Sequence, residues 1–111
     1  ITNLFRPKNR HIFKEEIKAV KKEALKTPVQ GIIAALEGMK VRKNREAIFY
    51  NSSYKKMIII SKKDPVLDYQ SLVEQASHKT IKKVELPDGH MSHIENKEVF
   101  SYNIMHFIEN I

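Results

Sequence analysis

Two titratable residues stand where short apolar runs give way to polar turns. Asp64 follows the run at 57–60, which reads Met-Ile-Ile-Ile, and His90 follows a second run that ends at Leu86. Apolar runs of this kind are typical of strands in a parallel sheet, where ligand chemistry lies at the carboxyl ends of the strands. We therefore expect Asp64 and His90 at one rim, where a carboxylate can orient an imidazole that acts as a general base.

These two turns and their order resemble the C-terminal part of an α/β-hydrolase. In that family the triad acid follows the seventh strand, and the triad histidine follows the eighth in a Gly-His context like Gly89-His90. The resemblance implies that Asp64 is the catalytic acid, that His90 is the catalytic base, and that a small ester-like substrate is hydrolysed without a cofactor. Epoxide, haloalkane and carbon–carbon bond hydrolases share this acid and histidine, so the bond type stays open.

The other working parts of such an enzyme are absent from the sequence. There is no Gly-x-Ser-x-Gly nucleophile elbow, the three glycines are too scattered to form one, and there is no His-Gly oxyanion-hole motif. Ser61 stands where the family often has a glycine, and the lysines at 55–56 stand where it often has Val-Pro. The chain starts at Ile1, so we expect an excised segment that is inactive alone and associates with a missing N-terminal part or with itself.

A metal site is the alternative interpretation of His90, His93 and Glu95. A helical zinc site has two histidines four residues apart with a glutamate between them. Here the histidines are three apart and the glutamate lies outside the pair. We therefore expect no metal, a rim position for His93, and for Glu95 a turn or helix-start position favoured by the helix dipole.

Size and composition are those of one small soluble domain. The chain has 111 residues, of which 41% are hydrophobic and 30% are charged. It has no cysteine, which excludes disulfides and thiolate metal sites and fits a reducing, cytoplasmic compartment. No apolar stretch approaches the roughly 18 residues of a membrane span.

The net charge of +7 is unevenly placed. Residues 1–50 hold 12 Lys and Arg against 5 Asp and Glu, whereas residues 51–111 hold 8 of each kind. A basic half of this kind can bind nucleic acid. Lysines dominate it, however, and aromatic side chains that stack on bases are not interleaved with them. We therefore expect a solvated helix face and neither a nucleic-acid nor a membrane partner.

Apolar spacing predicts two helices ahead of the sheet. In residues 12–25 the apolar positions recur at spacings of four, three and four, which marks one face of a helix. Thr27 as N-cap, with Pro28 at the first helical position, predicts the start of a second helix. The apolar stripe of that helix consists of Val29, Ile32, Ile33, Leu36 and Met39. Residues 1–10 have no period and contain a proline, so we predict a connection there.

The stretch 38–45, Gly-Met-Lys-Val-Arg-Lys-Asn-Arg, resembles the join between the lid and the seventh strand of α/β-hydrolases. In that family the join often has Gly-Met followed by Arg and an Asp-Arg pair. This resemblance implies that residues 1–26 are the end of the lid, or cap, region. Residues 27–111 would then form the C-terminal part of the hydrolase domain.

The remaining residues predict a βαβα unit. We expect strands at about 56–61 and 81–86, joined by a helix at about 69–78. Asp68 is the expected N-cap of that helix, and Asn96 is the expected N-cap of a final helix. The positions expected to face inward are Leu72, Val73 and Ala76 on the first helix, and Phe100, Ile104, Phe107, Ile108 and Ile111 on the last.

The sequence therefore predicts an α/β fold, the C-terminal part of an α/β-hydrolase, in which two N-terminal helices precede a βαβα unit with parallel strands. A two-stranded sheet is marginal on its own, so we expect it to be completed by other chain. Two other functions stay open: a non-catalytic α/β interaction domain and a basic nucleic-acid-binding module.

Overall fold

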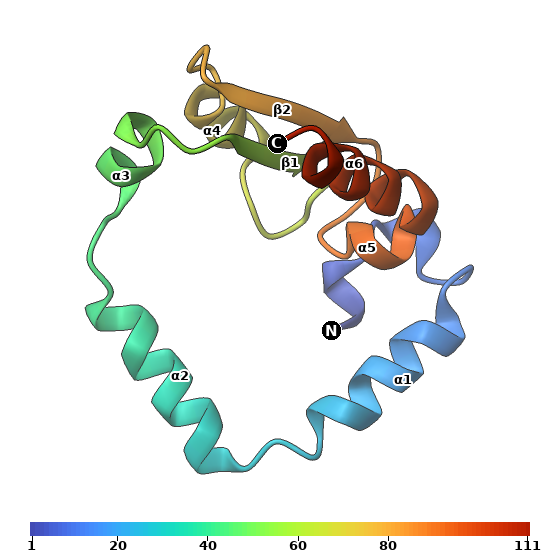
Figure 1. The fold of residues 1–111 in the computed structure, drawn as a ribbon. Coiled ribbons are helices and arrows are strands. Elements are labelled where there is room, and N and C mark those ends of the chain that lie inside the picture. The colour runs from blue at the N-terminus through green and yellow to red at the C-terminus, as the bar shows by residue number, and fades with distance from the viewer.

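The computed structural model describes residues 1–111 and shows a small α/β fold in which helices precede a parallel βαβ unit (Figure 1). The elements are α1 (Lys14–Ala24), α2 (Val29–Val41), α3 (Glu46–Asn51), β1 (Lys56–Ser61), α4 (Tyr69–Gln75), β2 (Ile81–Leu86), α5 (Ser92–Glu95) and α6 (Lys97–Glu109). Two short 3₁₀ turns, Thr2–Leu4 and Pro7–Asn9, precede them. The predicted order of helices and strands is confirmed, and α3 and α5 are additional helices.

The sheet consists of β1 and β2 side by side and parallel. Lys56 lies opposite Ile81, and Ser61 lies opposite Leu86, so both strands end at the same edge. The predicted strand limits are confirmed. Ile60 at the end of β1 is fully buried, as β-branched side chains on a covered sheet face are expected to be. This register brings the loops after the two strands together.

Helix α4 contacts β1 and begins where the sequence predicted. The side chain of Asp68 accepts a hydrogen bond from the backbone N–H of Ser71 at 3.0 Å, which confirms its role as the N-cap. The helix ends at Gln75, three residues earlier than predicted, because the chain turns at Ala76 and buries that residue beside the sheet.

Helix α6 departs from the prediction at both ends. Asn96 holds the N-cap position, but its side chain makes no capping hydrogen bond, and its backbone N–H closes the last turn of α5 on the carbonyl of Ser92. Ile108 and Ile111 are exposed rather than buried.

Helices α1 and α2 form an arm that leaves the sheet and returns to it through α3 (Figure 1). The predicted N-cap of α2 is wrong: the helix begins at Val29 with Pro28 as its cap, since Pro28 adopts an extended conformation. Of the predicted face of α1, only Ile17 is buried.

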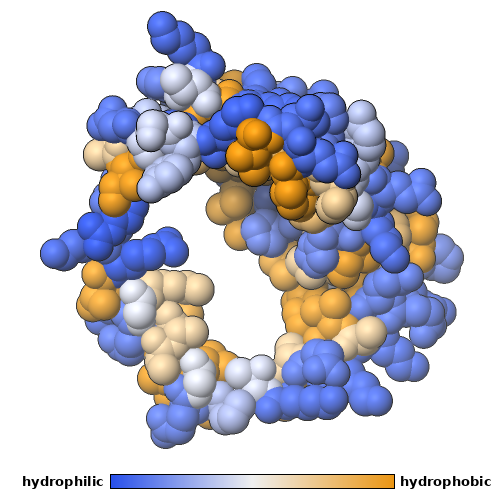
Figure 2. All heavy atoms as spheres, viewed as in Figure 1, coloured by the Kyte–Doolittle hydropathy of each residue, from blue (hydrophilic) through white to orange (hydrophobic).

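No residue of α2 is buried, and the side chains of its predicted apolar stripe are 46–69% exposed. In Figure 2 apolar side chains of the arm lie beside the open space that the arm and the sheet surround. The stripe therefore exists as predicted, but nothing in the chain covers it. None of the helices combines the length and the apolar character that crossing a bilayer requires.

Candidate active site

Asp64 and His90 lie in contact at the carboxyl edge of the sheet. Nδ1 of His90 is 2.9 Å from Oδ2 of Asp64. The side chain of Asp64 is 5% exposed, whereas that of His90 is 34% exposed. The structure therefore brings together the two residues that the sequence singled out, with the carboxylate inside and the imidazole open to solvent.

The loop after β1 fixes the Asp64 carboxylate. Its Oδ1 accepts hydrogen bonds from the backbone N–H groups of Val66 at 2.8 Å and Leu67 at 3.0 Å, which is an Asx-type turn. The backbone N–H of Lys62 donates to the carbonyl of Leu86 at 2.8 Å, so the loop is also tied to the end of β2. One carboxylate thus makes two kinds of contact, with the turn through Oδ1 and with the histidine through Oδ2.

The surroundings keep the Asp64 carboxyl ionised. Burial by itself raises its pKa, but the hydrogen bonds from the Leu67 N–H, from His90 and from the Val66 N–H together outweigh burial. The resulting pKa of Asp64 lies below the ordinary aspartate value. At neutral pH this group is a carboxylate, and it accepts a hydrogen bond from the Nδ1–H of His90.

The turn before His90 has no room for a side chain at Gly89. A Cβ placed on Gly89 would lie 2.5 Å from the backbone nitrogen of Arg6 and 3.0 Å from the carbonyl oxygen of Leu4. The backbone N–H of His90 donates to the same Leu4 carbonyl at 2.8 Å. Glycine is required at this position because another stretch of backbone lies directly against it.

That stretch is the N-terminal segment, residues 4–9, which the sequence predicted as a mere connection. Phe5 is completely buried, and the guanidinium of Arg6 forms an ion pair of 3.0 Å with Asp88 in the turn before His90. Burial raises the pKa of the Asp88 carboxyl, but its bond to Arg6 contributes to lowering that pKa below the ordinary value. The sequence predicted a connection here and did not predict that this segment packs against the His90 turn.

His93 and Glu95 occupy different environments. His93 is exposed, with its ring centroid 6.1 Å from that of Phe100. Glu95 is buried, and its Oε1 accepts hydrogen bonds from the backbone of Arg6 at 2.7 Å and from Nδ2 of Asn9 at 3.2 Å. Glu95 was predicted at a turn or helix start, but it is the last residue of α5, and its partners in the N-terminal segment were not predicted. No three His, Asp or Glu side chains come together in a metal-binding arrangement.

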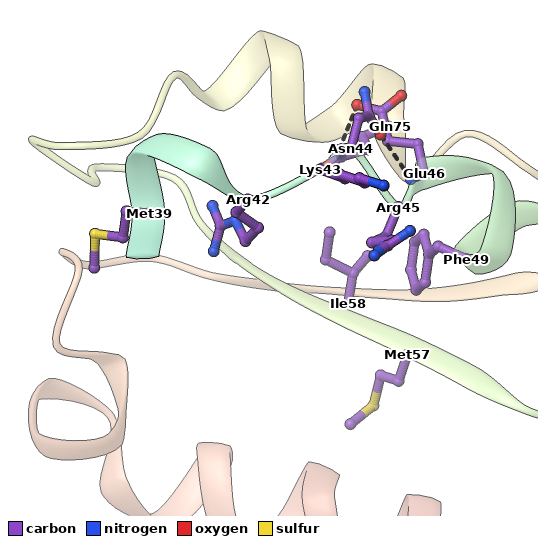
Figure 3. A pocket seen from close by; sticks show the side chains of 10 residues that line it. All are labelled: Met39, Arg42, Lys43, Asn44, Arg45, Glu46, Phe49, Met57, Ile58 and Gln75. Atoms are coloured by element: carbon purple, nitrogen blue, oxygen red, sulfur yellow. Dashed lines mark hydrogen bonds between the residues drawn. The ribbon is translucent and has the colours of Figure 1, made fainter. Parts of the chain in front are cut away.

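The largest hollow of the surface lies elsewhere, over β1 and the α2–α3 connection, and has a volume of about 740 Å³. Figure 3 shows Ile58 of β1 beside Arg45 and Phe49, whereas Met57 lies on the other side of the β1 ribbon. Neither Asp64 nor His90 is among its lining residues. The hollow lies beside β1, and it does not include the contact between Asp64 and His90.

The sequence matches no known protein family and no curated protein. The contact between Asp64 and His90 is therefore the feature from which a function can be argued.

Proposed function

We propose that this chain is the C-terminal segment of an α/β-hydrolase and supplies its catalytic acid, Asp64, and its catalytic base, His90. The observation that supports the proposal is the 2.9 Å hydrogen bond between the two side chains, formed across the ends of adjacent parallel strands. The asymmetry of burial agrees with it, since the orienting acid is enclosed and the base reaches solvent.

In this proposal the Asp64 carboxylate accepts a hydrogen bond from the Nδ1–H of His90 and so fixes the tautomer in which Nε2 carries a lone pair. No residue of the chain forms a hydrogen bond with Nε2 of His90, which leaves that nitrogen open to a nucleophile. Nε2 then removes a proton from a hydroxyl or a water and later returns it to the leaving group. The ionised Asp64 stabilises the imidazolium that forms between these two steps.

The nucleophile and the oxyanion donors come from residues outside these 111, since the sequence holds neither motif. The substrate class is a small carboxylic ester or a similar bond. The apolar side chains of α2, which nothing in the chain covers, are the surface we propose for contact with the rest of the enzyme or with a second copy.

The test is hydrolysis of p-nitrophenyl esters by the complete protein. The parent should turn over an ester, His90→Ala should abolish the turnover, and the matched variant His93→Ala should keep most of it. Loss of a base that belongs to a triad lowers kcat/KM by about 10²- to 10⁴-fold or more. A dead His93→Ala variant beside a near-normal His90→Ala variant would show that the base is misassigned. Thermal melts confirm that each variant is folded.

A further inference from the structure

Glu95 lies directly beneath the turn that carries His90, although the proposed chemistry gives it no role. The residue is only 8% exposed, and no lysine or arginine forms an ion pair with it. Its Oε1 accepts two hydrogen bonds. A Cβ added to Gly89 would lie 2.9 Å from its Oε2. Burying a carboxylate without a neighbouring cation costs free energy. The position of Glu95 against the Gly89 turn therefore needs a structural explanation.

The N-terminal segment supplies that explanation, because it lies between Glu95 and His90. The carbonyl of Leu4 accepts a hydrogen bond of 2.8 Å from the backbone N–H of His90. Two residues further along the chain, the backbone N–H of Arg6 donates a hydrogen bond of 2.7 Å to Oε1 of Glu95. The Nε–H of Arg10 donates back to the carbonyl of Phe5 at 3.2 Å. Two hydrogen bonds, joined by the covalent backbone of residues 4–6, thus connect Glu95 to the backbone of His90.

We propose that Glu95 is a positioning residue: by binding the backbone of Arg6 and the side chain of Asn9, it holds residues 4–9 against the Gly89-His90 turn and so keeps the His90 imidazole on Asp64. The catalytic consequence rests on the proposed function of His90. The structural part concerns only where His90 is held and stands independently of any reaction.

The chemistry of the contact predicts which substitution preserves it. Both donors to Oε1 are neutral amide groups, so an acceptor oxygen is needed but a negative charge is not. Glu95→Gln keeps such an oxygen in the same shape, whereas Glu95→Ala leaves the Arg6 N–H and the Asn9 amide without their partner. The matched control is Glu98→Ala, which removes an exposed carboxylate three residues further along.

The experiment compares these variants in the complete protein by two direct measurements of His90. The first is amide hydrogen exchange at His90, whose N–H is bound to Leu4. The second is the downfield Nδ1–H proton resonance of the imidazole bound to Asp64. We expect Glu95→Ala to speed the exchange about tenfold and to weaken or broaden the resonance. Glu95→Gln should stay within about twofold of the parent, and Glu98→Ala should not differ from it.

Steady-state kinetics adds a reading that a merely structural role would not give. Glu95→Ala should lower kcat about tenfold with KM nearly unchanged, and Glu95→Gln should restore kcat. Unchanged exchange and an unchanged resonance in Glu95→Ala would overturn the inference, and so would a Glu95→Gln variant as impaired as Glu95→Ala.

If Glu95→Ala does not fold, Asn9→Ala removes one of the two bonds and leaves the carboxylate in place. It should speed exchange at His90 about threefold, and parent-like exchange would count against the inference. Full activity of His90→Ala would instead refute the proposed function, while the exchange and the resonance would still decide whether Glu95 positions His90.

Discussion

Asp64 and His90, 26 residues apart in the chain, meet at 2.9 Å through Oδ2 and Nδ1, while the second oxygen of Asp64 closes its own loop. Removing the whole carboxylate of Asp64 would therefore affect both the histidine and the turn. Amide and alanine substitutions separate these two effects, because asparagine retains one oxygen and alanine retains none.

Asp64→Asn should lower kcat/KM of the complete protein by about 10²- to 10⁴-fold, close to the effect of His90→Ala. The amide keeps an oxygen for the N–H groups of Val66 and Leu67, but it lacks the charge that stabilises the imidazolium. Its melting temperature should stay close to that of the parent, whereas Asp64→Ala should melt lower. Activity of Asp64→Asn within a few-fold of the parent would contradict the assignment of the acid.

The 111-residue chain alone should hydrolyse p-nitrophenyl esters no faster than buffer does. A base without a nucleophile and oxyanion donors has little to act on, and His90 contacts no hydroxyl of this chain. The measurement is the initial rate before and after repurification. Turnover that persists and then disappears in His90→Ala would mean that a serine of the chain, such as the buried Ser92, serves as the nucleophile.

The isolated chain should associate at micromolar concentration. The apolar stripe of α2 is exposed and both outer edges of the two-stranded sheet are unpaired, and surfaces of these kinds associate. Light scattering should give a mass above that of the 13.0 kDa monomer. Leu36→Glu should lower this mass, whereas Glu37→Gln on the same helix should not. A monodisperse monomer with a cooperative melt would show that the chain is complete in itself.

Lowering the pH should reduce the free energy of unfolding, and part of this reduction should depend on Asp64. The pKa of this carboxyl is lowered in the folded state, so between that value and the ordinary value of about 3.9 the unfolded chain binds more protons. The ionised Asp64 therefore stabilises the fold at pH values above its ordinary pKa, and this stabilisation is lost as the pH falls through its lowered pKa in the folded state. Urea unfolding measured from pH 6 downward should show that the free energy of unfolding falls less steeply with pH in Asp64→Asn than in the parent. An identical slope in both proteins would argue against a contribution of Asp64 to the loss of stability in acid.

Gly89→Ala should impair the protein, whereas Gly38→Ala should not. A methyl group at Gly89 would lie 2.5 Å from the backbone nitrogen of Arg6, and neither backbone can move without displacing His90. Gly38 lies in α2 with no atom within 4 Å of an added Cβ, so alanine there should stabilise the helix by up to about 1 kcal/mol. Thermal melts and kcat/KM of both variants check the contrast, and equal effects would contradict it.

The sequence predicted that Asp64 and His90 lie together because both follow local signals, an apolar run and a polar turn, and the parallel register then brings the turns together. It did not predict the environment of Glu95. The contacts of that residue with Arg6 and Asn9 span 89 and 86 residues, and no periodic pattern marks either end of them. The apolar pair Leu4-Phe5 was the available signal that this segment packs against the rest of the chain.

Periodicity also identified the apolar stripe of α2 without revealing what it packs against. A repeat of 3.6 residues reports that one side of a helix avoids water, but the partner surface is encoded elsewhere. The missed helix α3 begins where Oδ1 of Asn44 accepts the N–H of Glu46 at 2.8 Å, and a single short contact of this kind is too weak a pattern to predict a helix.

The backbone N–H of His90 is engaged by the carbonyl of Leu4 at 2.8 Å. It is therefore not free to stabilise negative charge on a substrate oxygen, even though it belongs to the residue closest to the chemistry. Amide donors for a tetrahedral intermediate have to be unpaired in the resting enzyme and aimed at the position of the developing charge. In an enzyme built on this pair, the loop that carries the base accordingly makes no oxyanion contact through His90, and charge stabilisation and proton transfer belong to separate segments of the chain.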